Sequence, residues 1–312
     1  MRTLLKNVWL LDNFYCVEPA NILIEEERIA SVLRDEQAAD HIVDLSGCTV
    51  IPGLVDTDLS CADADRLRAR LKNCFSSGVT TVRCNQMIPA EATNLNVLYS
   101  YPVESYTDYL DRLTAGKLVA QGINLTAQLI KHTEEKLLYD ICCRSAQNGM
   151  WVTATASTLE ELKILVACGI TELLDIPDFP IPNEVIIRMV AKGICMTLRA
   201  DCSENLTPIQ RDNLRIFHEF GGLIALGSGK GNTTVSGKQI ISLMEIGLSL
   251  QDAVKCATLN GAIIVGTAHE DGSILAGKYA NMLVVQGNPF ETPDAFWGIR
   301  VIVQKGKLYQ AD

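Results

Sequence analysis

The sequence predicts an α/β fold, a (β/α)8 TIM barrel flanked by strand-rich segments at both ends of the chain. Between residues 51 and 271, eight short apolar runs alternate with helical patterns, which is typical of a parallel barrel. Residues 1–50 and 272–312 instead carry brief β-branched runs bounded by turn residues, and these predict strands. A chain of 312 residues with 48% hydrophobic content can bury a core of that size.

The N-terminal segment predicts several strands in succession. One apolar run covers residues 4–10. Residues 21–32 predict a hairpin, because apolar runs flank a turn that contains three consecutive glutamates. A further short run at 42–47 precedes the apolar stretch 49–55, with which the barrel opens.

Glycines and capping residues set the expected helix boundaries in the barrel region. The helix 65–77 ends at Gly78, and the helix 158–168 begins with a Thr-x-Glu-Glu sequence and ends at Gly169. The other expected helices are 109–120, 134–147, 183–192, 207–220, 237–246 and 250–261. The expected strands after the opening stretch are 79–84, 95–103, 123–130, 151–156, 170–176, 194–200 and 223–227, and strands return at 282–289 and 299–307.

Charge and composition limit the partners of the protein. The formal net charge of -10 argues against binding to nucleic acid or to an anionic membrane surface. No window reaches the ~18 uninterrupted apolar residues of a membrane span, and residues 1–9 lack the apolar stretch of a signal peptide. The 11 cysteines include no Cys-x-x-Cys pair, which predicts reduced thiols and a cytoplasmic location.

Three motifs carry a resemblance to a known family. Residues 52–57 are Pro-Gly-Leu-Val-Asp-Thr, residues 247–262 include Gly-Leu-Ser and Ala-Thr-Leu-Asn-Gly-Ala, and residues 272–285 include Gly-Ser-Ile-Leu-Ala-Gly-Lys before an apolar run. In combination they resemble the amidohydrolase superfamily, the metal-dependent hydrolases that include imidazolonepropionase and dihydroorotase. The resemblance implies that residues 1–50 and 272–312 form one composite β-sandwich and that residues 51–271 form the barrel.

The resemblance also implies that the metal ligands of the family are replaced in this chain. Where the family has His-x-His after the first motif, this chain has Asp58 and Ser60. The family has lysine on strand four, histidine on strands five and six, and aspartate on strand eight. The corresponding segments here, none of which contains the expected residue, are 126–128, 152–156, 173–175 and 227–229. We therefore expect no metal and no other cofactor.

Polar residues at the predicted strand ends indicate where a remaining function lies, because barrel folds place their sites there. Asp58 and Asp175, joined by Asp201, are candidates for a hard-cation or cationic-ligand site. The alternative is that they are solvated carboxylates or balance the charges of Arg199 or Lys230. Together the strand ends predict a polar pocket for a small ligand with donor and acceptor groups. The full set of candidates is Asp58, Cys84, Gln128, Thr155, Asp175, Arg199, Ser228 and Lys230.

Two functions fit these residues. The first is an amidohydrolase-superfamily protein without the metal centre, a non-catalytic protein that binds a small molecule or acts as a scaffold, with a homo-oligomer left open. The second is a hydrolase acting on a C–N bond of a cyclic amide or related small substrate, through a non-standard site of Asp58, Cys84, Asp175 and Lys230. A nucleophilic role for Cys84 requires a nearby base and a lowered pKa, and a buried inert thiol is the alternative. Metal content separates the two functions most directly.

Overall fold

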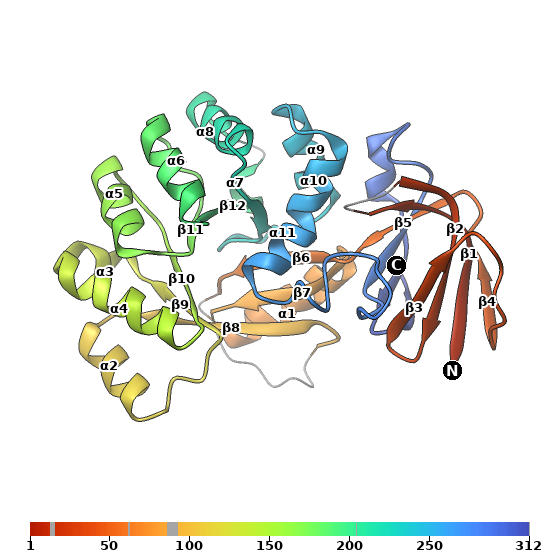
Figure 1. Cartoon of the computed structure of the whole chain (residues 1–312), viewed down its shortest axis with the longest axis horizontal. Coiled ribbons are helices and arrows are strands. Elements are labelled where there is room, and N and C mark those ends of the chain that lie inside the picture. The colour runs from red at the N-terminus through yellow and green to blue at the C-terminus, as the bar shows by residue number, and fades with distance from the viewer. Residues whose placement is uncertain (13–15, 62, 86–92, 204, 312) are drawn as a thin grey trace.

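A computed structural model describes residues 1–12, 16–61, 63–85, 93–203 and 205–311 of the chain. Its strands form two sheets of eight strands each. One sheet is parallel and surrounded by helices, and the other is mixed and lies beside it (Figure 1). Both ends of the chain lie at the mixed sheet, so the barrel is the middle part of the sequence (Figure 1).

The parallel sheet confirms the predicted (β/α)8 barrel. Its strands follow one another in chain order, and each pairs in parallel with the next. The strands are β6 (Leu54–Leu59), β7 (Val79–Cys84), β8 (Asn96–Val103), β9 (Gly122–Leu125), β10 (Trp151–Ala154), β11 (Glu172–Leu174), β12 (Cys195–Arg199) and β13 (Ile224–Gly227).

The barrel closes between its first and last strands through contacts near their carboxyl ends. The N–H of Gly229, just beyond β13, donates to the carbonyl of Asp58 at 2.7 Å. The hydroxyl of Thr57 donates to the carbonyl of Leu226 at 3.2 Å. Gly227 permits this approach, because a Cβ at that position would lie 2.9 Å from the Cβ of Asp58. The backbones of β6 and β13 therefore approach each other closely at the mouth of the barrel.

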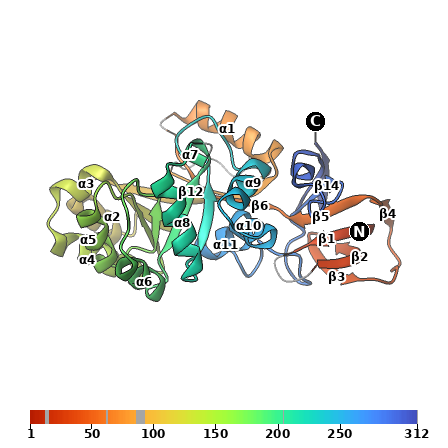
Figure 2. The ribbon, with the colours of Figure 1, turned by 90° about the horizontal axis from the view of Figure 1, so that it is seen from above.

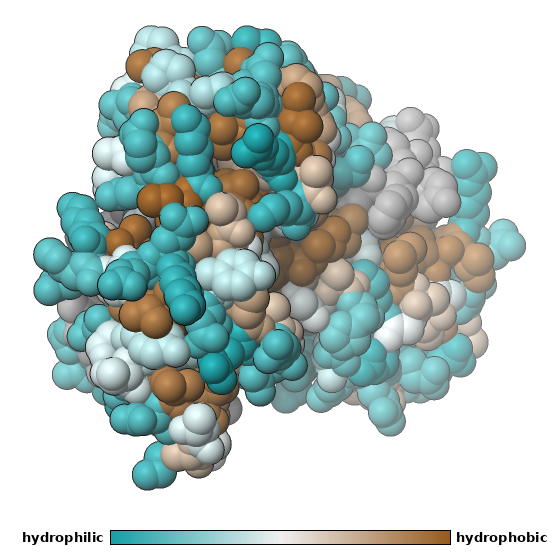
Figure 3. Space-filling view, turned by 60° about the vertical axis from the view of Figure 1, so that its left-hand side comes forward, coloured by the Kyte–Doolittle hydropathy of each residue, from teal (hydrophilic) through white to brown (hydrophobic). Residues whose placement is uncertain are grey.

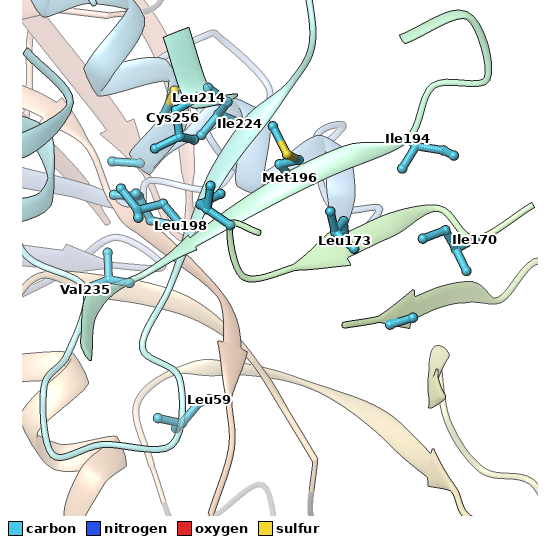
Figure 4. Packing of buried hydrophobic residues seen from close by; sticks show 14 of the residues in the cluster. Leu59, Ile170, Leu173, Ile194, Met196, Leu198, Leu214, Ile224, Val235 and Cys256 are labelled. Carbon is cyan, nitrogen blue, oxygen red and sulfur yellow. The ribbon is translucent and has the colours of Figure 1, made fainter. Parts of the chain in front are cut away.

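Helices cover the outside of the barrel (Figures 1 and 2). Buried apolar side chains fill the space between them and the strands, and Figure 4 shows Leu173 of β11 and Met196 and Leu198 of β12 among them. No helix within the described ranges has the length and apolar character needed to cross a lipid bilayer. The helices are α1 (Ala64–Ser76), α2 (Tyr106–Thr114), α3 (Ala127–His132), α4 (Glu135–Gln147), α5 (Leu159–Cys168), α6 (Asn183–Ala191), α7 (Ala200–Ser203), α8 (Pro208–Glu219), α9 (Gly237–Glu245), α10 (Leu250–Ala257) and α11 (Leu259–Ile264).

The expected fourth strand, 123–130, is wrong in its second half. The strand β9 ends at Leu125, and Thr126 caps the short helix α3 by accepting a hydrogen bond from the N–H of Leu129 at 3.3 Å. Threonine is a favoured N-cap residue, and the Ala-Gln-Leu sequence after it has high helix propensity. The apolar residues near 130 that suggested a strand are instead the buried side of this helix.

The mixed sheet combines strands from the two ends of the chain. The N-terminal strands are β1 (Arg2–Leu11), β2 (Cys16–Glu25), β3 (Arg28–Leu33), β4 (His41–Asp44) and β5 (Cys48–Pro52), and the C-terminal strands are β14 (Met282–Gln286), β15 (Ile299–Gln304) and β16 (Lys307–Gln310). The short 3-10 helix η2 (Pro293–Trp297) connects β14 to β15. The two groups meet where β5 runs antiparallel to β14, with Val50 opposite Val284. A common apolar core contains side chains from both groups.

The apolar stretch 49–55, with which the barrel was expected to open, is divided between the two sheets. Its first part lies in β5 of the mixed sheet, and its second part begins β6 of the barrel. Gly53 stands between them, where a Cβ would lie only 2.2 Å from the hydroxyl oxygen of Thr80. A side chain there would force β6 and β7 apart, so glycine lets the chain pass from one sheet to the other.

Candidate functional site

The candidate site lies at the carboxyl ends of the barrel strands, around Arg199. Arg199 is the last residue of β12, Asp58 lies near the end of β6, and Asp175 directly follows β11. The guanidinium of Arg199 forms ion pairs with both carboxylates, with 3.2 Å from Nε to Asp58 Oδ2 and 3.6 Å from Nη1 to Asp175 Oδ2. Asp58 also accepts a hydrogen bond from the hydroxyl of Ser60 at 2.8 Å. Three separate strands therefore bring one cation and two anions together.

The burial of these groups strengthens the electrostatic attraction between their charges. Arg199 is 9% exposed and Asp58 is 7% exposed, whereas the side chain of Asp175 is 34% exposed. Coulomb attraction between partly desolvated charges is stronger than in water, because less water screens it. Arg199 and Asp58 therefore form the inner pair, and Asp175 presents its carboxylate nearer to solvent.

The backbone at Asp175 adopts an uncommon conformation that orients the Asp175 carboxylate toward Arg199. Its φ angle is 76°, in the left-handed region that aspartate tolerates better than most residues. The carboxylate oxygen Oδ1 accepts a hydrogen bond from the N–H of Ile176 at 2.9 Å. The turn after β11 is therefore fixed by the side chain of Asp175 itself, which leaves Oδ2 directed at Arg199.

A pocket of about 440 Å³ opens beside Arg199, between the ends of β10, β11 and β12. A second pocket of about 300 Å³ lies toward the ends of β6 and β7 and shares Lys230 with the first. The larger pocket is lined by both charge signs and by neutral donors and acceptors, and its polar lining residues include Thr155, Ser157, Asp175, Asp178, Arg199, Gln210 and Lys230. Its volume falls within the range of small-molecule sites.

Eight residues were predicted to line the site. Five of them line this pocket or pair with a residue that does, and the other three lie elsewhere. Gln128 is exposed on α3, because the strand that was expected to carry it ends at Leu125. Cys84 is 1% exposed at the end of β7, with its thiol 3.6 Å from the carbonyl of Leu98. Ser228 is fully buried and bonded to a carboxylate behind the mouth. The side chain of Asp201 lies outside what the structure describes. The residues brought together are Asp58, Thr155, Asp175, Arg199 and Lys230.

The carboxylate bound to Ser228 is Asp56, which joins β6 to the segment after β13. Asp56 accepts hydrogen bonds from the N–H of Ser228 at 2.9 Å, from the Ser228 hydroxyl and from the N–H of Asp58 at 3.1 Å. Burial raises the pKa of Asp56 to about 6, since desolvation outweighs these hydrogen bonds. Asp56 therefore holds the closing seam of the barrel and titrates above the usual range of a carboxyl group.

Asp56 should make folding stability depend on pH between about 4 and 6. Its folded-state pKa exceeds the unfolded value of 3.8, so its contribution is fully present below pH ~4 and is lost as pH rises through about 6. The full effect is on the order of 3 kcal/mol. We expect the stability advantage of the wild type over Asp56→Asn, measured by urea unfolding, to shrink across this window. Parallel profiles for the two proteins would refute this role, and Asp35→Asn, at an exposed carboxyl, should leave the profile unchanged.

A second charged pair, which was not predicted from the sequence, lies inside the barrel. Arg83 of β7 and Glu172 of β11 stand on opposite sides of the eight-stranded barrel, and Nη2 of Arg83 lies 2.6 Å from Oε2 of Glu172. Both side chains are almost completely buried. The Thr197 hydroxyl donates to the other carboxylate oxygen of Glu172, and the guanidinium of Arg83 lies 5.5 Å from the ring centroid of Trp151. The pair forms a polar centre of the barrel.

A signal for this pair exists in the sequence. Arg83 is the only charged residue of its predicted strand, 79–84, and Glu172 lies inside the predicted strand 170–176, where a charge on a buried strand requires a partner of opposite sign. The closure of the barrel is needed to see that these two strands face each other. Within the described residues, no group of three or more His, Cys, Asp and Glu side chains is arranged to hold a metal ion.

Comparison with known proteins relates this architecture to a family. The model of the amidohydrolase family matches residues 107–308. The probable imidazolonepropionase of Xenopus tropicalis is 28% identical over 133 residues, which cover 38% of this chain and 31% of that protein. The dihydroorotase of Syntrophotalea carbinolica is 33% identical over 91 residues, which cover 27% of this chain and 21% of that protein. These matches span less than a third of the length of either relative.

Solved structures share the fold over the whole chain. A Xaa-Pro dipeptidase with bound methionine superimposes with a TM-score of 0.84 at 17% identity and covers 99% of this chain and 100% of its own. Phenylurea hydrolase B has a TM-score of 0.79 at 16% identity, with 100% of this chain and 97% of that chain covered. Ochratoxinase from A. niger has a TM-score of 0.80 at 16% identity, with 100% and 96% covered. At these identities the likeness is one of fold.

Proposed function

The chain belongs to the amidohydrolase family, and from this premise we propose that it is a metal-free, non-catalytic member that binds a small polar molecule at the barrel mouth. The proposal rests on Arg199, whose guanidinium lies between the carboxylates of Asp58 and Asp175. The positive charge of Arg199 therefore lies between the two carboxylates that a metal ion at the mouth would use as ligands.

The residues at the mouth do not fit a metal site of the family. Carboxylate oxygens suit hard cations, but the two carboxylates here already balance a guanidinium that cannot be deprotonated. A divalent ion would have to displace Arg199 and would then lie beside its buried positive charge. Ser60, in the position of the second histidine, donates its hydroxyl to Asp58 and so adds no free anionic ligand.

The pocket beside Arg199 supports binding of a ligand with both charge signs or with both donor and acceptor groups. Lys230 and Arg199 supply positive charge, and Asp175 and Asp178 supply negative charge. Asp178 is held by the hydroxyl of Thr207 at 2.6 Å. Such a lining compensates the lost hydration of a zwitterionic or strongly polar molecule, whereas an apolar molecule would leave these groups unpaired.

The alternative, a hydrolase that uses Asp58, Cys84, Asp175 and Lys230, has less support at Cys84. Its thiol is nearly inaccessible to a substrate and lies against a backbone carbonyl inside the barrel wall, whereas a reactive cysteine is usually partly exposed. A cytoplasmic location remains part of the proposal. The nine cysteines whose state the structure describes are free thiols, as expected in a reducing compartment.

Metal analysis tests the proposal. We expect protein purified without chelator to contain far less than one Zn²⁺, Mn²⁺ or Fe²⁺ per chain, and we expect a chelator to leave the melting temperature unchanged, because no bound metal contributes to stability. The variant Arg199→Met removes the internal cation and leaves two carboxylates together. Millimolar Ca²⁺ should therefore raise the melting temperature of the variant but not that of the wild type.

Nearly one transition metal per chain in the wild type would overturn the metal-free part of the proposal. The same melting assay, run with a panel of small zwitterions and polar amides, tests the binding part. A ligand of the mouth should stabilise the wild type and lose this effect in Thr155→Trp, which fills the pocket next to Asp175. Turnover of any compound by the metal-free protein would favour the hydrolase.

A further inference from the structure

A separate groove lies on the outer wall of the barrel, between α5 and α6. It encloses about 380 Å³ and is lined by Lys163, Val166, Ala167, Val185, Arg188 and Lys192. Three of these residues lie on α5, two lie on α6, and Lys192 directly follows α6. None of the six lines the pocket at Arg199. The groove is therefore distinct from the pocket at Arg199. In Figure 3, which brings the left-hand side of Figure 1 forward, the barrel wall is mostly hydrophilic, with separate hydrophobic patches.

Two of the three cations of this groove have no ion pair within the described part of the chain. Acidic residues stand one helical turn before Lys163 and Arg188, yet they form no salt bridge with them. This differs from other helices of the barrel, where Arg112, Arg144 and Arg215 each pair with a carboxylate one turn away. None of the six lining residues of the groove is acidic.

The third cation, Lys192, is fixed by the backbone of the neighbouring helix. Its ammonium donates to the carbonyl of Val166 at 2.7 Å and to that of Ala167 at 3.3 Å. These carbonyls end α5 and carry the partial negative charge of a helix C-terminus, which Lys192 offsets. The positive charges of Lys163 and Arg188 are then not balanced by a carboxylate of the described residues. They lie at a groove whose apolar lining includes the buried side chains of Val166 and Val185.

We propose that this groove binds a small organic polyanion, a molecule with two or three carboxylate or phosphate charges and a compact apolar part. The volume fits such a molecule, and the three cations surround the place where its charges would lie. The protein carries a formal net charge of -10, so a groove whose charged lining residues are all cations is a local exception that favours anions. The aliphatic stems and the valine floor accommodate the apolar part.

Calorimetric titration of the full-length protein with citrate and with phenyl phosphate tests this site. We expect saturable binding of one molecule per chain at low ionic strength, which weakens as salt is added, because the charges are partly exposed. Acetate, with one charge, should bind much more weakly. The double variant Lys163→Gln/Arg188→Gln should bind the polyanion roughly tenfold or more weakly. Whichever of citrate and phenyl phosphate binds more tightly identifies the carboxylate or phosphate class.

Two control variants distinguish binding in the groove from binding elsewhere on the protein. The variant Lys131→Gln/Lys136→Gln removes the same charge from exposed positions on α3 and α4 and should keep the wild-type affinity. Lys230→Gln alters the barrel mouth and should also keep it, so the result is independent of the function proposed for the mouth. The inference fails if neither anion binds saturably, or if the control variants lose as much affinity as the groove variant.

Discussion

Deletion of residues 272–312 is expected to abolish cooperative folding and to produce an aggregating chain. The deletion removes β14, which pairs along the whole length of β5, from Cys48 to Pro52. It also removes five side chains from the buried core of the mixed sheet, namely Ile274, Ala280, Met282, Val284 and Val303. The strand β5 would become an exposed apolar edge, and such edges pair with other chains.

The deletion also affects the barrel, because the C-terminal segment bonds to it. The side-chain amide of Gln304 donates to the carbonyl of Thr80 in β7 at 3.2 Å, and Asn281 donates through its side chain to Asp271. Gel filtration and thermal circular dichroism of the shortened chain provide the measurement. A chain that ends at Gln310 keeps β16 and should behave as the full protein. A monomeric shortened chain with an unchanged melting temperature would refute the joint sheet.

The variant Glu172→Ala is expected to cost ~3–5 kcal/mol of folding free energy, because it leaves the guanidinium of Arg83 buried without a counter-charge. Arg83 is only 2% exposed, so water cannot replace the lost carboxylate without opening the barrel. The hydroxyl of Thr197 loses its acceptor as well. Urea unfolding at neutral pH measures the change.

Two companion variants make this result specific to the buried pair. Replacing both partners, in Arg83→Met/Glu172→Leu, should recover stability to within about 1.5 kcal/mol of the wild type, because apolar side chains can replace a buried ion pair. Glu219→Ala breaks an exposed pair with Arg215 on α8 and should cost less than ~1 kcal/mol. Equal losses for Glu172→Ala and Glu219→Ala would contradict the central role of the buried pair.

The alternation of strands and helices was predictable because each barrel strand is a short, buried apolar run and many helix ends carry a clear signal. Thr158 and Gly169 mark α5 in the sequence, and the structure has the threonine accepting from the N–H of Glu161 and the glycine at a φ of 90°. The segment 123–130 was not predictable in the same way. Its short apolar runs suit a strand or a buried helical side, and the threonine in its middle decides between them.

The candidate site was predictable only as far as strand ends determine it. Asp58, Asp175 and Arg199 each lie at or next to the end of a strand, and a parallel barrel brings these ends to one rim. Their pairing depends on distances across the barrel, which the sequence does not contain. The role of Asp56 depends in the same way on the closing of β6 against the segment after β13. Gln128 was misplaced because its strand was extended too far.

The two-ended construction of the mixed sheet has a consequence for how the protein is made. The strand β5 ends at Pro52 and its partner β14 begins at Met282, so about 230 residues must be synthesised between them. At roughly 5–20 residues per second, the first strands wait roughly 10–50 s on the ribosome with one side of β5 unpaired. The barrel can form during that interval, whereas the sheet that contains both termini is completed only after the last strands have emerged. The strand β5 is thus translated early but is among the last to reach its final partner, and ribosome-associated chaperones have their longest opportunity to act on residues 1–52.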